Sequence, residues 1–222
     1  MKTICMCNKK GGVGKTSVAI NMAYLLSNTK GADIKVLYID NDEQGNGTDF
    51  FKGSYDRTLA DLLLGKADIT EIIQQDILQQ SLESIADQYD YCIIDNPPAI
   101  NITVINAFVA ADTAIIVTQP HIFSEAGVLK TIDYIKTLQE YNPYLQYRVL
   151  MNNSSGSQNS LSRSAALRNQ SIPLMNTKIR RTIDRIDAAT STHKSIYETS
   201  PRCKFSQDLR RVVVEMLEEE LL

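Results

Sequence analysis

The chain has 222 residues, which is enough for one well-buried α/β domain and short for two. With 43% hydrophobic residues, 22% charged residues and a net charge of −3, it has an ordinary globular composition. No apolar run reaches the roughly 18 residues that span a bilayer, and no signal-peptide core is present, so a transmembrane or secreted protein is not expected. The four cysteines lack CxxC or metal-ligand spacing, which favours a reduced, cytoplasmic protein.

Apolar, β-rich runs alternate with helical patterns along the chain. Strands are predicted at residues 3–8, 34–40, 91–95, 113–118, 147–152 and 172–178. Helices are predicted at 17–26, 58–64, 69–88, 101–111, 124–140, 160–170, 179–189 and 205–220. This alternation predicts a single α/β domain over residues 1–222, with a mostly parallel, doubly wound sheet flanked by helices. Ligands of such folds bind at the carboxyl ends of the strands.

Residues 10–16, Lys-Gly-Gly-Val-Gly-Lys-Thr, lie between the first predicted strand and the first predicted helix. Glycines let the backbone curl so that successive N–H groups point at phosphate oxygens, and the following helix adds its positive end. Lys15 then reaches the outer phosphates, and the Thr16 hydroxyl can ligate Mg²⁺. A glycine-rich turn with a chance lysine is the alternative, but the strand–loop–helix context favours a P-loop NTPase. The predicted nucleotide-binding residues are Gly11, Gly12, Val13, Gly14, Lys15, Thr16 and Ser17.

Carboxylates follow the next two strands. Asp40 and Asp42 lie at the end of the second predicted strand, where they can organise Mg²⁺-bound water or an attacking water. The alternative is an ordinary turn, because turns are commonly rich in Asp, Asn and Gly. Asp95 ends the third predicted strand after four β-forming residues, as in a Walker B strand whose carboxylate meets Mg²⁺. Pro97 and Pro98 stiffen the exit, which suits a γ-phosphate sensor. A chance apolar strand capped by aspartate is the alternative for Asp95.

Charge is unevenly distributed along the chain. Residues 161–211 hold 11 Lys or Arg and 4 Asp or Glu, whereas residues 1–160 hold 12 and 18, and the last eleven residues add four glutamates. The basic segment is either a face for a polyanion or only a solvated helix surface. Near the C-terminus, apolar residues recur at helical spacing while Glu215 and residues 218–220 occupy the polar side. That pattern favours a core-packed closing helix over one that binds an anionic membrane.

Three motifs together resemble the ParA-type partition ATPases, the deviant Walker A group. They are residues 10–16, residues 40–46 (Asp-Asn-Asp-Glu-Gln-Gly-Asn) and residues 95–98 (Asp-Asn-Pro-Pro), in the family's order and approximate spacing. The lysine that opens the first motif is the specific mark. Glu43 departs from the family's usual proline, and Asn96 departs from its usual small residue. Since the sequence begins almost at the first strand, it resembles the small form without an N-terminal helix-turn-helix, and operator binding is not expected.

The resemblance implies roles for individual residues. Lys10 would cross the interface of an ATP-sandwiched dimer to contact the partner's nucleotide, much as an arginine finger supplied in trans does. Lys15 would hold the β- and γ-phosphates, and Asp42 would orient the hydrolytic water. Thr16, Asp40 and Asp95 would support Mg²⁺.

The resemblance also implies ATP as the nucleotide, and no Asn-Lys-x-Asp guanine motif is present. Asn152, at the end of its strand, is either an adenine contact or simply a loop asparagine. Residues 120–127 match a family stretch near the dimer and nucleotide region, without assigned roles.

ParA-type dimers bind nonspecific DNA through basic residues in their C-terminal part, and a ParB-like centromere-binding protein stimulates ATP hydrolysis. The resemblance therefore implies a homodimeric, nucleoid-associated partition ATPase. Two alternatives keep the nucleotide switch: positioning of a protein cargo over the nucleoid, and MinD-like cycling on a membrane. Arg180, Arg181 and Arg185 are expected on one predicted helix, with at least two on a shared face. The candidate DNA contacts are Arg163, Arg168, Lys178, Arg180, Arg181, Arg185, Lys194, Arg202 and Lys204.

Overall fold

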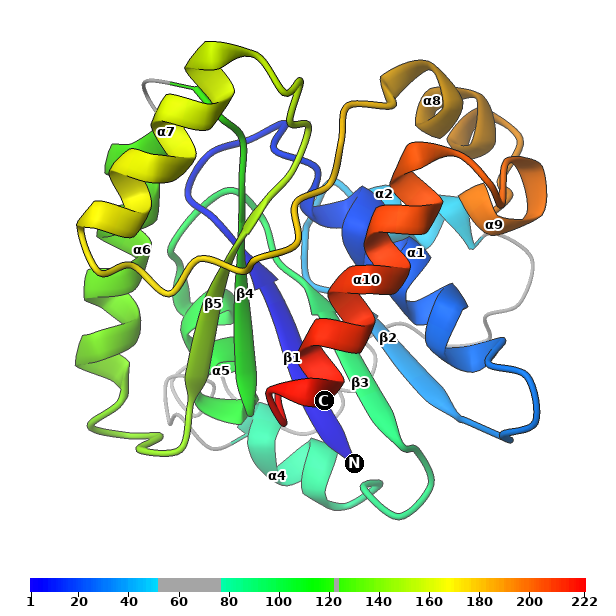
Figure 1. Cartoon of the computed structure of the whole chain (residues 1–222). Coiled ribbons are helices and arrows are strands. Elements are labelled where there is room, and N and C mark those ends of the chain that lie inside the picture. Colours follow the sequence, from blue (N-terminus) through cyan, green and yellow to red (C-terminus); the bar gives the residue numbers. More distant parts are fainter. Residues whose placement is uncertain (52–76, 122–123) are drawn as a thin grey trace.

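The computed structural model describes residues 1–51, 77–121 and 124–222. In these residues one parallel sheet has the strand order β2-β3-β1-β4-β5 (Figure 1). Its strands are β1 (Lys2–Cys7), β2 (Val36–Asp40), β3 (Tyr91–Asp95), β4 (Thr113–Thr118) and β5 (Gln146–Met151). The predicted fold class is confirmed, and the carboxyl ends of all these strands lie along one edge of the sheet.

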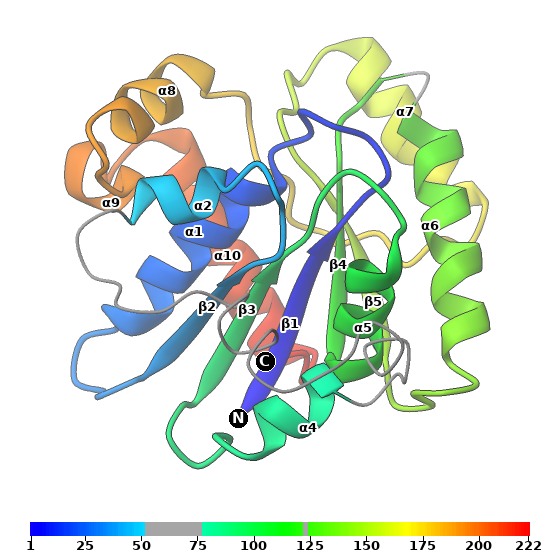
Figure 2. The same cartoon turned by 180° about the vertical axis from the view of Figure 1, so that it is seen from behind.

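Helices cover both faces of the sheet, as Figures 1 and 2 show from opposite sides. One face carries α1 (Lys15–Ser27), α8 (Ile183–Ser191), α9 (Ile196–Thr199) and α10 (Lys204–Glu218). The other carries α4 (Ile77–Glu83), α5 (Ile102–Ala110), α6 (Ser124–Leu138) and α7 (Gln158–Asn169). The short helix α2 (Asn46–Phe50) follows β2 and contacts α1. No helix among the described residues combines the length and apolarity needed to cross a bilayer.

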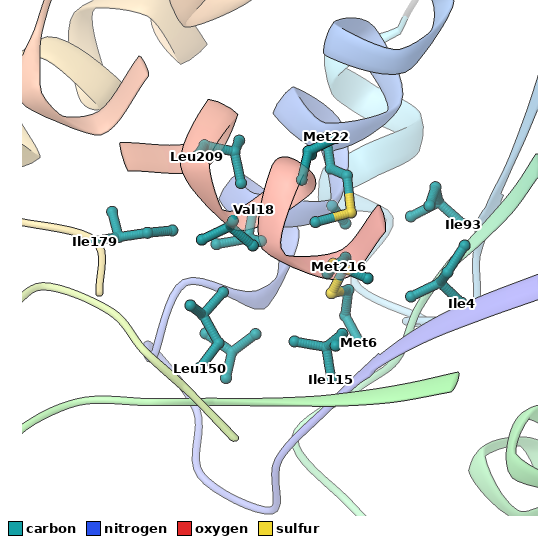
Figure 3. Close-up of a cluster of buried hydrophobic side chains, with 14 of the residues drawn as sticks. Ile4, Met6, Val18, Met22, Ile93, Ile115, Leu150, Ile179, Leu209 and Met216 are labelled. Atoms are coloured by element: carbon teal, nitrogen blue, oxygen red, sulfur yellow. The ribbon is translucent and has the colours of Figure 1, made fainter. Parts of the chain in front are cut away.

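Alternating side chains of each strand supply the two hydrophobic cores, because successive strand residues point to opposite faces. In β1, Met6 enters the core under α1 and α10, whereas Cys5 enters the core under α4, α5 and α6. Figure 3 shows the first core, in which Met22 of α1 and Met216 of α10 lie over Met6 and Ile115 of the sheet. Strands buried on both faces explain why the sequence reads as continuous apolar runs.

The final helix is the closing helix that the sequence predicts. Phe205, Leu209, Val212 and Met216 are fully buried against α1 and the sheet. The expectation that Glu215 lies on the solvent side is wrong, because Glu215 is only 8% exposed. Its carboxylate points inward to the chain between α7 and α8, and this contact accounts for a second error in the prediction.

The predicted strand at 172–178 does not form. Val149 makes an isolated bridge to Leu174, but the pairing goes no further because Glu215 accepts the backbone N–H groups of Asn176 (2.6 Å) and Thr177 (2.7 Å). Proline at position 173 also has no N–H to donate. The segment therefore runs beside β5 as extended chain without becoming a regular strand.

The predicted helix at 179–189 starts later than expected, at Ile183. The N–H groups of Ile179 and Arg180 are used elsewhere: Ile179 donates to Met151 (2.8 Å) and Arg180 donates to the Asp208 carboxylate (2.9 Å). Arg180 and Arg181 therefore precede α8, and the expectation that they share a helical face with Arg185 is wrong.

The predicted helix at 58–64 lies outside the described residues. The one at 69–88 is described only from residue 77, as α4, and it ends at Glu83, five residues earlier than predicted. Other predicted elements agree with the structure to within about three residues where it describes them. The short helices α2 and α9 are not predicted. Their four or five residues carry too little apolar periodicity to be recognised.

Candidate nucleotide-binding site

The glycine-rich loop turns twice between β1 and α1. Gly12 and Gly14 have φ values of 70° and 91°, in the left-handed region that other residues rarely adopt. Gly11 and Gly12 are exposed, whereas Val13 is fully buried in the core beneath them. Helix α1 then begins at Lys15. The loop is therefore anchored by Val13 and presents the amides of its glycines at the carboxyl edge of the sheet.

Two side-chain amides from neighbouring strand ends brace this loop. Asn152 donates to the Val13 carbonyl (2.8 Å), and Gln119 donates to the Gly12 carbonyl (2.9 Å). Asn152 lies so close to Gly14 that a Cβ atom there would collide with its amide nitrogen. Asn152 is 6% exposed, and in this structure its amide group positions the loop. Its predicted contact with adenine stays a prediction.

Asn8 joins the start of the loop to β4. Its amide group donates to the Val117 carbonyl (2.7 Å) and accepts the backbone N–H of Lys10 (2.9 Å). These bonds fix the backbone of Lys10, and Lys10 as a whole is half-buried. Asn8 and Gln119 were not singled out from the sequence. The available signal is that each is an amide residue directly after an apolar strand, at the edge where ligands bind.

Lys15 is buried to an extent unusual for a lysine, at 6% exposure. Burial lowers the pKa of its ammonium group, while Asp95, Cys7 and Asp42 act in the opposite direction. An ammonium that has lost much of its hydration is stabilised by an anion brought close to it. Lys15 is therefore placed to attract the phosphates of a ligand that enters the loop.

Asp95 is the most perturbed carboxyl among the described residues. Burial raises its pKa to about 7, and Asp40 adds to this rise, whereas Thr16, Lys15 and Tyr38 oppose it. The residue is 1% exposed, and among the described residues its Oδ1 atom has no hydrogen-bond partner. A cation at Oδ1 would satisfy this atom and favour the ionised form, so the site fits a metal.

Asp40 lies beside Asp95 in the sheet, because β2 and β3 pair in register at these two residues. Its Oδ2 accepts the N–H (2.7 Å) and hydroxyl (3.0 Å) of Thr48, and its Oδ1 accepts the N–H of Asp42 (3.2 Å). Asp42 is half-buried, and its carboxylate accepts the N–H of Gln44 (3.1 Å). These bonds shape the turn after β2 and hold both carboxylates next to the loop.

No group of three His, Cys, Asp or Glu side chains gathers as a metal cage in the part of the chain that the structure describes. Mg²⁺ seldom needs one, since it commonly binds one or two carboxylates together with water and substrate phosphates. Thr16, Asp40 and Asp95 can supply such a partial set, which a phosphate would complete.

Two asparagines connect the strand ends. From the sequence alone, Asn41 has no assigned role and Asn96 is noted only as a departure from the family's usual residue. Asn41 donates to Asn96 Oδ1 (2.7 Å) and to the Thr103 carbonyl (3.1 Å), and Asn96 donates to the Met6 carbonyl (3.1 Å). Asn96 is 1% exposed. Its departure from the usual small residue therefore adds a buried amide that ties the carboxyl ends of β1, β2 and β3 together.

Two hollows adjoin the phosphate loop. One, of about 200 Å³, lies between the loop, the end of β5 at Asn152 and Asn153, and α8 at Ile183 and Ile186. The other, of about 500 Å³, lies between α1, α2 and α8 and reaches Thr16. The first combines apolar side chains with amide groups beside the loop, which is the composition of a small-molecule pocket.

The basic residues proposed for DNA do not form one group. Helix α7, with Arg163 and Arg168, packs on one face of the sheet, while the chain from α8 to α10 packs on the other. Arg168 lies close to the Met175 carbonyl (3.3 Å). Arg180 makes a two-bond ion pair with Asp208, with both N–O distances at 2.8 Å. Lys178 is half-buried. The exposed candidates on the α8 side are Arg181, Arg185, Lys194, Arg202 and Lys204.

Comparisons with known proteins agree with this geometry. A family model described as an AAA domain, AAA_31, matches residues 1–78 and 74–147. The chain is 31% identical to a ParA family protein of Chlamydia pneumoniae over 98% of each chain. It is 33% identical to the chromosome partitioning protein ParA of Myxococcus xanthus over 65% of this chain and 62% of that protein. A putative plasmid partition protein of Borrelia burgdorferi, solved with AMPPNP, has the same fold, with a TM-score of 0.81 at 19% identity over 98% of this chain and 99% of that one.

Proposed function

The chain belongs to the ParA-type P-loop ATPases, and on that premise we propose that it is a Mg²⁺-dependent, ATP-switched dimer that partitions DNA. One observation carries the proposal: a braced glycine loop, a buried lysine and three aspartates converge at the carboxyl ends of β1, β2 and β3. This set can bind a triphosphate, neutralise it and orient a water molecule.

In this proposal the phosphates lie on the amides of residues 11–17, with Lys15 against the outer phosphates. Thr16, Asp40 and Asp95 hold Mg²⁺ or its water shell. When bound, the metal neutralises charge on the phosphates during phosphoryl transfer. The hollow of about 200 Å³ beside Asn152 takes the base and ribose.

Asp42 orients the attacking water in this scheme. Its carboxylate is held in the turn after β2, close enough to Lys15 to affect the pKa of that lysine. Lys10 opens the loop, with its backbone fixed by Asn8. A second copy facing this loop would receive the Lys10 ammonium at its own nucleotide, where negative charge builds during phosphoryl transfer.

ATP binding closes the dimer and creates the DNA-binding form. The cytoplasmic protein then associates with the nucleoid. Hydrolysis, stimulated by a ParB-like centromere-binding protein, reverses these steps. The exposed cations between residues 181 and 204, on α8 and in the chain around it up to the start of α10, support a DNA face better than those of α7, because there are five of them on one side of the molecule.

The membrane-cycling alternative is less well supported. The main apolar side of α10 is buried against α1 and the sheet, and Val214 and Leu217 are the large apolar side chains of this helix that stay exposed. The helix therefore offers no extended apolar face to insert in a bilayer. The alternative of a protein cargo keeps the same nucleotide switch and the same DNA face. A pull-down of the partner distinguishes it from DNA partition.

Light scattering with and without Mg²⁺-ATP tests the proposal. The wild type is expected to change from monomer mass to dimer mass only with nucleotide. In a separate assay of phosphate release, Lys10→Ala is expected to lose ATP turnover. Lys9→Ala is the matched control, because this neighbouring lysine is exposed. Asp42→Ala is expected to accumulate the ATP dimer, with slow hydrolysis.

DNA retention measured over a salt series completes the test, because contacts to phosphates release counterions and weaken steeply with salt. Pelleting with anionic liposomes provides the comparison for a membrane role. A wild type that stays monomeric at saturating Mg²⁺-ATP, or one that pellets with liposomes but not with DNA, refutes the proposed function.

A further inference from the structure

Tyr38 connects β2 to the carboxylate at the end of β3. Its hydroxyl donates to Asp95 Oδ2 at 3.3 Å. Tyr38 lies two residues before Asp40, and β2 and β3 pair in register at Asp40 and Asp95. The phenol ring therefore points along the same face of the sheet toward the site, on the side covered by α1.

The ring occupies space that a glycine of α2 leaves open. A Cβ atom at Gly47 would lie 2.8 Å from Cε1 and 3.0 Å from Cζ of Tyr38, and closer still to its hydroxyl. Gly47 does not have a positive φ value, so its backbone conformation does not require glycine. Glycine also weakens a helix. Its presence in α2 is explained by the Tyr38 ring, which packs as well against Phe51, with the ring centres 5.0 Å apart.

The two oxygens of Asp95 are thereby made different. Oδ2 accepts the Tyr38 hydroxyl, while Oδ1 is buried without a partner among the described residues. Helix α2 also holds Asp40 through Thr48. Tyr38 therefore contacts two parts of the site. Its ring packs on α2, the helix that holds Asp40, and its hydroxyl contacts the carboxylate of Asp95.

We propose that Tyr38 is a positioning residue for the cation site. Its ring packs on Gly47, and its hydroxyl holds Asp95 so that Oδ1 faces the metal. This inference rests on the proposed function, because it requires a cation bound with nucleotide. The competing view is that Tyr38 only fills the core between β2 and α2. The two differ in what the hydroxyl contributes, since Tyr38→Phe keeps the ring and removes the hydroxyl that donates to Asp95.

Binding of Mn²⁺, followed by electron paramagnetic resonance in the presence of a non-hydrolysable ATP analogue, separates these views without relying on turnover. Tyr38→Phe is expected to weaken Mn²⁺ binding about tenfold, at the lower end for removing a partner of a metal ligand because the bond is long. Affinity for the nucleotide without metal is expected to stay unchanged. Tyr197→Phe is the matched control, since its hydroxyl donates to the Ser206 carbonyl at 3.1 Å, on another part of the fold.

Gly47→Ala gives a second measurement. It is expected to displace the ring and lower both stability and Mn²⁺ affinity, and combining it with Tyr38→Leu is expected to restore stability but not Mn²⁺ affinity. If the wild type binds Mn²⁺ with nucleotide and Tyr38→Phe binds it equally well, the inference is overturned while the proposed function stands. If the wild type binds no Mn²⁺ with nucleotide, the proposed function and the inference fall together.

Discussion

Replacing Asp95 with asparagine is expected to change how the stability of the nucleotide-free protein depends on pH. Burial raises the pKa of this carboxyl from 3.8 to about 7 in the folded state. The folded protein then holds the proton more tightly than the unfolded chain does. The stability that the protonated carboxyl contributes is complete below the unfolded pKa and is lost as pH rises through about 7. The asparagine side chain of the variant has no such proton to lose.

The size of the effect follows from the two pKa values. At about 1.4 kcal/mol per pKa unit, these two pKa values lower the free energy of unfolding of the wild type by about 2 kcal/mol at pH of about 5 and by about 4 kcal/mol at pH of about 8.5, because the unfolded chain releases the proton first. The free energy of unfolding of Asp95→Asn, minus that of the wild type, is therefore expected to increase by about 2 to 3 kcal/mol over this range. Any constant cost of packing the amide cancels in this comparison.

Urea unfolding at a series of pH values, without nucleotide or metal, measures the difference. It is expected to persist at high salt, since desolvation rather than distant charge causes most of the shift. Saturating Mg²⁺-ATP is expected to reverse the order and favour the wild type, because a bound cation stabilises the carboxylate. A stability difference that stays flat with pH, or shrinks as pH rises, would falsify the claim that burial perturbs Asp95.

Three further predictions concern the loop, the last helix and the chain that contacts it. Glu215→Ala is expected to cost about 3 kcal/mol in urea unfolding, because two backbone N–H groups lose a buried, charged acceptor. Gly14→Ala is expected to abolish nucleotide binding in calorimetry while the protein stays folded, since φ is 91° there and the new Cβ meets a bracing amide; wild-type affinity would contradict the assignment of the loop. Arg180→Ala is expected to lower stability by about 3 kcal/mol because the buried Asp208 carboxylate loses its two-bond partner and keeps the longer ion pair with Arg211, at 3.5 Å. Arg181→Ala is instead expected to keep stability and reduce the salt slope of DNA retention by about one unit. An unchanged slope in Arg181→Ala would remove it from the DNA face.

The sequence predicts the parts of the fold whose cause is local. Strands β3 and β4 match their predicted bounds because they are apolar runs buried on both faces. The segment at 172–178 looks equally apolar, but its backbone donors are taken by Glu215, nearly forty residues later in the chain. Nothing in the local pattern carries that information. The same holds for the late start of α8, which follows from Asp208.

The site divides in the same way. The phosphate loop and the aspartates are recognisable because their chemistry requires particular residues at fixed spacing. The residues that hold them in place are not, because their partners come from other strands: Asn8 is fixed by β4 and Asn96 by β1. Tyr38 and Gly47 illustrate this most clearly, since each looks ordinary alone and only their contact explains both.

Charge counting along the sequence also overestimates the basic surface. Residues 161–211 carry an excess of cations, but the Arg180 guanidinium is paired with Asp208, which is 2% exposed. This pair holds the chain that enters α8, and α8 forms one wall of the hollow beside the phosphate loop. Arg180, which the sequence alone makes a candidate DNA contact, thus joins the last helix to the candidate nucleotide site. The proposed DNA binding would then depend on the exposed cations around Arg180, and a substitution of Arg180 would affect it only indirectly, through the wall of this hollow.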